Sequence, residues 1–382
     1  MTNSNLPIPY SYSVETIPAD EAEDIKKVVQ AMESILARSH AKTGRFLADV
    51  HVKTHGYARG EFRVLPNLPS DLAQGLFERD GVYPAVVRFS NASSHKQSDA
   101  IPDGRGMAIK VSEVAGGLLS TDEPQVSAAQ DFLMINHPVF FARNAKDFLR
   151  LEQVLAQVDD SSFTTMRESL TGGDWNPLRW HWREMLTAAQ IVGQLPSHLA
   201  SNTYFSMTPI RYGNFVAKYR ARPIGDRNDS YLNLIQRLVS EADALRLALE
   251  ETLRIQEVLF EFQVQLRTSD RSMPIEDATV VWPESESPFR TVAHLLLPRQ
   301  EIGVLARDNN LKSLSFNVWH ALEAHRPLGG INRVRRVAYE ISSKWRRQQI
   351  DEITHEWQNG YAQGRIKMAA GGLIGNTTEQ VE

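Results

Sequence analysis

Cysteine is absent from the 382 residues of this sequence. The absence excludes disulfide bridges, zinc sites built from thiolates, iron–sulfur clusters and cysteine nucleophiles, because each of these needs a sulfur atom. Any bound metal must therefore be held by histidine, carboxylate, tyrosine or methionine side chains. The composition is otherwise that of a globular protein, with 42% hydrophobic and 23% charged residues.

An excess of positive charge and long apolar runs are also missing. The 42 Lys and Arg residues are outnumbered by 46 Asp and Glu residues, so the net charge is -4 and nucleic acid is not an expected partner. No apolar run reaches the roughly 18 residues that span a bilayer. The N-terminus also lacks the basic start and apolar centre of a signal peptide. We therefore expect a cytoplasmic protein without a membrane span.

The chain divides into an arm, one large domain and a tail. Residues 1–19 are rich in Pro, Ser and Asn without periodicity, which predicts an extended N-terminal arm. Such an arm can wrap a neighbouring subunit, so a homo-oligomer is possible. Residues 20–365 are expected to form a single domain, and residues 366–382 a flexible tail.

Periodicity predicts both helices and strands within this domain. Apolar residues recur every three or four positions between Asp20 and Ser39, as in an amphipathic helix. Strands and turns are expected between about 46 and 142, where the short runs are FRVL, AVVRFS, GMAIKV and NHPVFF. Helical excursions follow at about 146–195 and 230–256, with strands at 205–223 and 258–268, an irregular stretch at 280–300 and a helix at about 333–357. This order predicts an α+β protein built on an antiparallel sheet or barrel.

One helical stripe near the C-terminus carries chemistry. Arg335, Tyr339 and Arg346 are spaced i, i+4 and i+11, so they lie along one side of the expected helix. A guanidinium one turn from a phenol can donate to its oxygen and stabilise the phenolate. A phenolate is a hard anionic ligand for ferric iron. The alternative is an exposed Arg beside a core Tyr.

A histidine and an arginine on predicted strands are further candidates. His51 alternates with Val50 and Val52, and a histidine on a strand can act as an acid or base near neutral pH. His55 competes for this role, and spacing does not choose between the two. Arg88 shares a strand face with Ser90, where a guanidinium can clamp a carboxylate.

The segment QDFLMINHPVFFARNAKDF holds the last candidates. Asn136 lies just before a proline-containing turn and offers an amide. Phe140, Phe141 and Phe148 form either plain core or a flat aromatic wall.

Taken together and in this order, these segments resemble the haem-dependent catalase superfamily. The stretch VHVK…GEF is similar to the family's distal-histidine strand, and VRFS…DGRGMAIKV is similar to its next two strands. INHPVFF is similar to its distal-asparagine turn, and RRVAY…R to its proximal tyrosine helix. The resemblance covers roughly residues 45–350 and is nearer to short, catalase-related haem proteins than to full-length catalases. It implies a catalase-like antiparallel β-barrel core with helical insertions, a C-terminal proximal helix and haem b as the cofactor.

The resemblance implies a role for each matching residue. Tyr339 would be the proximal iron ligand and Arg335 its hydrogen-bonding partner, which favours ferric iron. His51 would be the distal acid and base that takes the proton of a bound hydroperoxide and returns it to the leaving oxygen, with Ser90 orienting it. The other matches, to residues that contact the haem, its propionates or the peroxide, are Val50, Arg88, Asn136, Phe148 and Arg346.

Two departures concern the distal strand. The family's arginine three residues before the distal histidine is Ala48 here, so one propionate contact is missing or supplied by Arg45. One residue is inserted after His51 relative to catalases, which leaves His55 as the alternative distal residue. A third departure lies at the asparagine. Counting back from Pro138 places Ile135 at the catalytic position and Asn136 one residue later.

The resemblance implies a haem peroxidase that reduces hydrogen peroxide or organic hydroperoxides with electrons from an unidentified donor. The sequence lacks the terminal extensions that bury the haem in large catalases, and a more open distal side favours larger substrates. A true catalase, rearrangement of fatty-acid hydroperoxides as in allene oxide synthases, and non-catalytic haem binding are alternatives. Allene oxide synthases carry Thr directly before the distal His, where this sequence has Val50, whereas a distal His55 would put Thr54 there.

Overall fold

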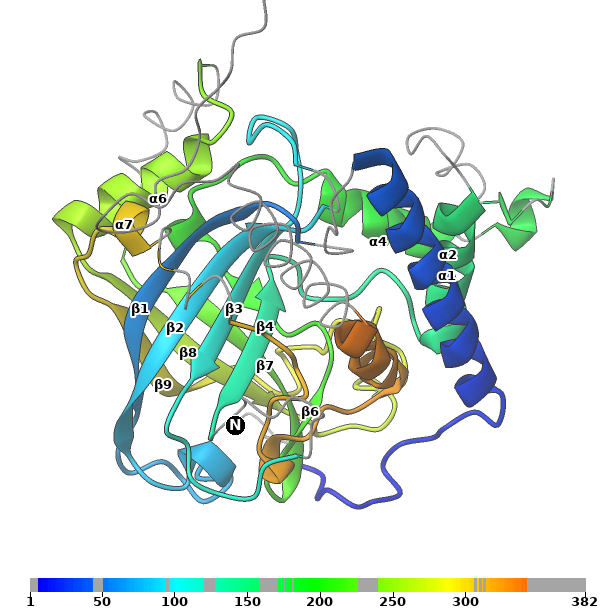
Figure 1. Ribbon diagram of the computed structural model, residues 1–382. Coiled ribbons are helices and arrows are strands. Elements are labelled where there is room, and N and C mark those ends of the chain that lie inside the picture. The colour runs from blue at the N-terminus through cyan, green and yellow to red at the C-terminus, as the bar shows by residue number, and fades with distance from the viewer. Residues whose placement is uncertain are drawn as a thin grey trace, which may run out of the picture.

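An antiparallel sheet that closes on itself forms the centre of the protein (Figure 1). The computed structural model describes residues 6–43, 51–93, 96–119, 128–157, 171–172, 174, 176–180, 182–225, 240–305, 308, 311 and 314–341. The strand order is β5-β4-β3-β2-β1-β9-β8-β7-β6, and β5 also pairs with β7. The strands from β5 through to β7 therefore make a closed barrel, with β6 paired beside β7. The expected α+β fold on an antiparallel β-barrel is confirmed.

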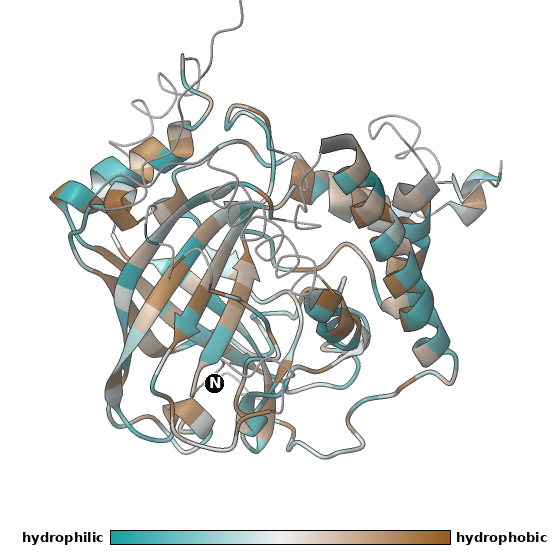
Figure 2. Cartoon of the chain, viewed as in Figure 1, coloured by the Kyte–Doolittle hydropathy of each residue, from teal (hydrophilic) through white to brown (hydrophobic). Residues whose placement is uncertain are grey.

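The barrel strands follow the alternation of the sequence. They are β1 Thr54–Val64, β2 Gly81–Asn91, β3 Arg105–Val111, β4 Gln130–Ile135, β5 Tyr204–Phe205, β6 Ile210–Tyr212, β7 Phe215–Pro223, β8 Val258–Leu266 and β9 Arg290–Leu297. Apolar and polar residues mix along them, visible as changes of colour in Figure 2. The inward residues pack into one aromatic core, in which the rings of Phe132 and Phe262 lie 4.6 Å apart. The barrel therefore has a filled interior, and a ligand site has to lie outside it.

Two sequence expectations for strands differ from the structure. The expected irregular stretch at 280–300 contains β9, which pairs with both β1 and β8. Its residues alternate between the core and the outer face, and that pattern was missed because Pro and Ser residues precede it. The run NHPVFF, in contrast, is a turn, and the strand β4 is the apolar run just before it.

Helices pack on the outside of the barrel. The described helices of more than one turn are α1 Glu21–Thr43, α2 Ala145–Gln157, α4 Trp182–Val192, α6 Ala244–Ile255 and a helix at residues 330–341. A single helical turn, α7, spans Ile302–Leu305, and the short 3-10 turns are η1 Gly75–Phe77, η2 Pro177–Arg179, η3 Leu199–Ser201 and η4 Glu323–His325. The predicted C-terminal helix is present from residue 330 to 341, and its expected continuation to Trp357 lies outside the described residues.

The helix at 330–341 is held between the barrel and the pair α1 and α2 (Figure 1). Its residues Val334 and Ala338 pack against Val28 and Met32 of α1 and Leu149 of α2. This three-helix contact fixes the helix that carries the predicted iron ligand. None of the described helices is long and apolar enough to cross a membrane.

The N-terminal arm lies along its own chain. Residues 6–18 contain no helix or strand. The amide of Tyr10 donates to the carbonyl of Asn214 at 2.7 Å, and the ring of Tyr10 packs near Trp282 and Leu328. Glu15 accepts from the amide of Gly329 at 2.7 Å and from the guanidinium of Arg333. The arm is therefore anchored at the start of the 330–341 helix.

Candidate functional site

The candidate site lies on the outer face of strands β1 to β4. Val87 and Phe89 of β2 point into the barrel core, so the alternating residues Arg88 and Ser90 point outward. Ser90 faces Gly106 of β3 in the sheet register. The expected common face of Arg88 and Ser90 is therefore present, and it faces the 330–341 helix side of the barrel.

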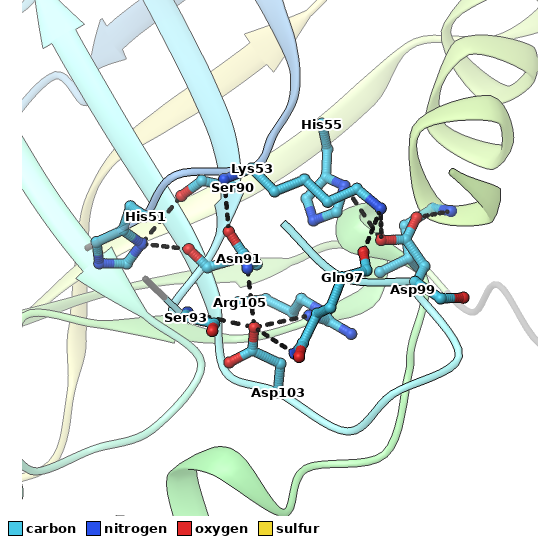
Figure 3. A network of polar contacts seen from close by, with 12 residues as sticks. His51, Lys53, His55, Ser90, Asn91, Ser93, Gln97, Asp99, Asp103 and Arg105 are labelled. Atoms are coloured by element: carbon cyan, nitrogen blue, oxygen red, sulfur yellow. Dashed lines mark hydrogen bonds and ion pairs between the residues drawn. The ribbon is translucent and has the colours of Figure 1, made fainter. Parts of the chain in front are cut away.

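His51 stands over this face, three residues before β1. Its Nδ1 lies 2.5 Å from the carbonyl oxygen of Asn91 and 3.1 Å from Oγ of Ser90 (Figure 3). A carbonyl oxygen only accepts, so Nδ1 carries the proton and Nε2 is left as the basic nitrogen. His51 has a φ of 59°, a left-handed conformation that few residues other than glycine adopt. The backbone is thus bent to bring this ring onto Ser90.

The surroundings of His51 keep it neutral. Burial and the positive charges of Arg88 and Arg335 lower the pKa of His51 to about 4, against a smaller opposing effect of its bond to Asn91. At neutral pH the ring is therefore a free base. That is the state needed to accept a proton from a substrate.

His55 lies inside the protein, at the end opposite to His51 of the network of polar contacts that Figure 3 shows. It is 0% exposed, and neither ring nitrogen has a hydrogen-bond partner. Its nearest charged neighbour is Asp99, at 3.8 Å, which itself pairs with Lys53 at 2.7 Å. Burial and the charges of Arg105 and Lys53 lower the pKa of His55 to about 3. Of the two histidines, only His51 faces Ser90.

Arg88 holds the backbone of the distal segment. Its Nη2 donates to the carbonyl oxygen of His51 at 2.7 Å and to Oγ1 of Thr54 at 2.8 Å. These bonds fix the bend between His51 and the start of β1. Arg88 is half-buried on the same outer face.

The 330–341 helix brings Arg335 and Tyr339 into contact. Nη2 of Arg335 donates to the phenol oxygen of Tyr339 at 3.3 Å, one helical turn away. The guanidinium is aimed by Oδ1 of Asn332 at 3.4 Å and Oγ1 of Thr208 at 3.5 Å. The carbonyl of Asn332 in turn accepts from the indole of Trp319 at 2.8 Å. The guanidinium is thereby held against the phenol oxygen of Tyr339.

Tyr339 contacts the same sheet face as His51. It packs against a cluster that includes Tyr57, Ala108 and Leu133, all on the outer face of β1, β3 and β4. Ala108 is two residues along β3 from Gly106, the residue beneath the ring of His51. Two residues of a strand span about 7 Å. His51 and Tyr339 thus lie against the same face of the sheet, at positions two residues apart along the strand.

Ile135 rather than Asn136 shares the row of Ser90. The register pairs Ser90 with Gly106 and Gly106 with Ile135, so these three residues point to one face. The Oδ1 atom of Asn136 accepts from the amide of Arg105 at 2.6 Å, and its backbone amide donates to the carbonyl of Arg105 at 2.9 Å. The structure therefore places Asn136 as an anchor of the turn after β4.

The three phenylalanines form a wall between the distal turn and the 330–341 helix. The rings of Phe140 and Phe141 stack at 4.2 Å, and Phe148 lies 6.0 Å from each. Phe148 also packs against Ile331 and the α1/α2 contact. All three rings are half-buried rather than in the barrel core.

Some predicted residues lie outside the described part of the chain. These are Val50 and Arg346, together with Ala48 and Arg45 of the sequence comparison. Other residues of the site were missed from sequence. No sequence motif marks Gly106 or Thr208 as site residues. The position of Asn332, three residues before Arg335 on the same helix, could have predicted its contact with Arg335.

The donor set fits a haem better than a bare metal ion. Among the described residues, no group of three His, Asp or Glu side chains gathers as the ligands of a free ion would. A single phenol backed by a guanidinium suffices only where a macrocycle supplies the other ligands. Tyr339 would hold the iron of a haem bound against this sheet face, and His51 would supply a base beside it.

Solved structures similar to this protein are catalases. A fungal catalase matches with a TM-score of 0.60 and 17% identity over 81% of this chain and 61% of its own. Catalase A from Saccharomyces cerevisiae has the same TM-score and identity over 81% and 63%. A bacterial catalase matches with a TM-score of 0.58 and 17% identity over 90% and 64%. No protein-family model matches the sequence, and neither does any curated protein.

The protein therefore has a catalase-like fold. The chain spans less than two thirds of the length of each of these catalases.

Proposed function

We propose that the protein is a haem-dependent peroxidase that reduces hydrogen peroxide or organic hydroperoxides. The observation that carries the proposal is that two pairs, His51 with Ser90 and Arg335 with Tyr339, lie against the same outer face of the sheet. Tyr339 would ligate haem b, and Arg88, Arg346, Val50 and Phe148 would contact it. The bound haem iron would supply the redox chemistry by which the O–O bond is broken.

The residues of the chain supply the proton transfer. Nε2 of His51 would accept the proton of the hydroperoxide and return it to the departing oxygen, while the bond from Nδ1 to Asn91 keeps the ring in the right tautomer. Overall, ROOH with two electrons and two protons gives ROH and water. Two molecules of an aromatic one-electron donor, such as a phenol, would provide the electrons.

The purified protein tests the proposal. We expect an absorption spectrum of tyrosinate-ligated ferric haem, and steady consumption of peroxide when guaiacol is added as the donor. His51→Ala should retain haem and lose about 100-fold in turnover, the usual contribution of a general base. His55→Leu, which changes the histidine at the other end of the network, should leave turnover unchanged.

Other outcomes separate the alternatives. Vigorous oxygen release without a donor would make the protein a true catalase, and conversion of a fatty-acid hydroperoxide without a donor would make it a rearranging enzyme. Haem binding with full turnover in His51→Ala would remove the mechanism.

A further inference from the structure

Ile135 belongs to the row of paired residues that begins with Ser90, and its side chain is the next one in that row beside the ring of His51. An alanine at Gly106 would place its Cβ 2.8 Å from Nδ1 of His51 and 2.7 Å from Oγ of Ser90, so the histidine ring lies directly over Gly106. Ile135 of β4 is the residue that pairs with Gly106 of β3. Cβ atoms of facing residues in an antiparallel pair are about 5 Å apart on the same face. Ser90 therefore borders the ring on one side and Ile135 on the other.

An apolar cluster surrounds Ile135. It packs with Ile191 of α4, with Met207, and with the stacked rings of Phe140 and Phe141. The two polar partners of the His51 ring, Oγ of Ser90 and the carbonyl oxygen of Asn91, both belong to β2, whereas Ile135 belongs to β4, on the other side of β3. His51 thus lies at a boundary between polar groups of β2 and the apolar cluster around Ile135.

This boundary distinguishes two kinds of peroxide. Hydrogen peroxide carries a hydroxyl at both ends, and the end away from His51 would meet hydrocarbon, where it loses its hydrogen bonds to water. An organic hydroperoxide carries carbon at that end. The amide oxygen of Asn136 does not relieve the difference, because it is bound to the amide of Arg105.

We infer that the apolar cluster around Ile135 contacts the hydrocarbon group of an alkyl or aryl-alkyl hydroperoxide, and that Ile135 is the residue that selects it over hydrogen peroxide. The inference rests on the proposed function and narrows its substrate class. The oxygen-bearing end of the substrate would face Nε2 of His51, and the hydrocarbon would contact Ile135 and its neighbours. The product of the two-electron reduction is the corresponding alcohol, which can occupy the same space without reacting.

Binding of an inert alcohol tests the inference apart from catalysis. The probe is 2-phenyl-2-propanol, the alcohol formed from cumene hydroperoxide, titrated into the haem-loaded full chain by calorimetry. Ile135→Asn should weaken its binding about tenfold, which corresponds to about 1.4 kcal/mol. Ile135→Thr provides a smaller change should the asparagine variant fail to fold. Ile224→Asn, the same substitution at an Ile that is 37% exposed and lies just beyond β7, is the matched control and should bind as the parent does.

Turnover provides the second measurement. The ratio of kcat/KM for cumene hydroperoxide to that for hydrogen peroxide should fall about tenfold in the Ile135 variants and stay unchanged in Ile224→Asn. Unchanged alcohol binding in folded Ile135 variants would overturn the inference, even if the parent is an active peroxidase. If the parent consumes no peroxide at all, the proposed function fails, while alcohol binding that depends on Ile135 would still support an apolar ligand site.

Discussion

The ring of His51 occupies the space that a side chain on Gly106 would fill. A Cβ built on Gly106 would stand 2.8 Å from Nδ1 of His51, closer than side chains approach one another. Glycine at this position of β3 is therefore required by the histidine above it and by Ser90 on the neighbouring strand. The same row carries Ser90 on one side and Ile135 on the other.

Gly106→Ala should displace the His51 ring and leave the barrel intact. Strand residues tolerate alanine, whereas His51 and Ser90 must move to admit the new methyl group. We expect peroxide turnover to fall about 100-fold, as for a misplaced catalytic group. Thermal unfolding and the haem spectrum should change little. Full activity in this variant would show that the ring does not act from this position.

Tyr339→Phe should abolish stable haem incorporation, because it removes the proposed iron ligand and leaves the guanidinium of Arg335 facing an apolar ring. The absorbance of the haem relative to that of the protein measures the effect after purification. Tyr219→Phe is the matched control. It removes a phenol that donates to the carbonyl of Leu133 at 3.3 Å inside the barrel, and it should bind haem fully. Equal loading of both variants would refute the ligand assignment.

Peroxide turnover should be insensitive to pH down to about pH 5. His51 must be neutral to accept a proton, and burial with the charge of Arg88 lowers its pKa to about 4. The rate should therefore decline only as the pH approaches that value. Measurement of kcat/KM for peroxide from pH 8 to pH 4 checks this, and a half-loss near pH 6.5 would indicate an ordinary, exposed histidine.

His55→Leu should make the protein less sensitive to acid. The folded-state pKa of His55 is lowered to about 3, below the unfolded value of 6.5, so its contribution to stability is lost as the pH falls below 6.5. Between pH 7 and pH 5 this single group costs about 2 kcal/mol. Leucine cannot be protonated, so urea denaturation should show that much less loss in the variant. Equal acid sensitivity in both proteins would mean that His55 titrates normally.

Arg333→Met should release the N-terminal arm. Arg333 pairs with Glu15 of the arm, with Glu21 of α1 and with Glu276, to which its Nη2 donates at 2.8 Å. Removal of this cation from among three carboxylates should destabilise the protein by about 3 kcal/mol.

Limited proteolysis should then cut the arm of Arg333→Met. The control is Lys146→Met, whose ion pair with Asp20 lies in solvent, and which should resist the protease as the parent does. An arm that stays protected in Arg333→Met would show that its backbone bonds, such as that of Tyr10 to Asn214, suffice.

Much of the proximal side could be predicted from sequence. The spacing of Arg335 and Tyr339 on a helix fixes their contact, because residues four apart on a helix are neighbours wherever the helix lies. The same holds for Arg88 and Ser90, which alternation places on one face of β2. The expected helix at 20–39 and the strands at 85–90 and 106–111 are also present.

The distal side depended on register, which spacing does not give. A shift of one residue turns a strand side chain to the opposite face, so the choice between Ile135 and Asn136 needed the pairing of β3 with β4. The choice between His51 and His55 likewise needed the bend at His51, which puts one ring on Ser90 and leaves the other buried beside Asp99.

The sequence by itself determined that sulfur chemistry is excluded and that a phenol and a guanidinium share a helix face, because composition and helical spacing are local properties. Only the tertiary structure decided which histidine meets Ser90, why β3 carries a glycine beneath it, and which of Ile135 and Asn136 shares the sheet face of Ser90. Those contacts join segments far apart in the chain, and their geometry is set by strand pairing and packing rather than by any spacing along the sequence.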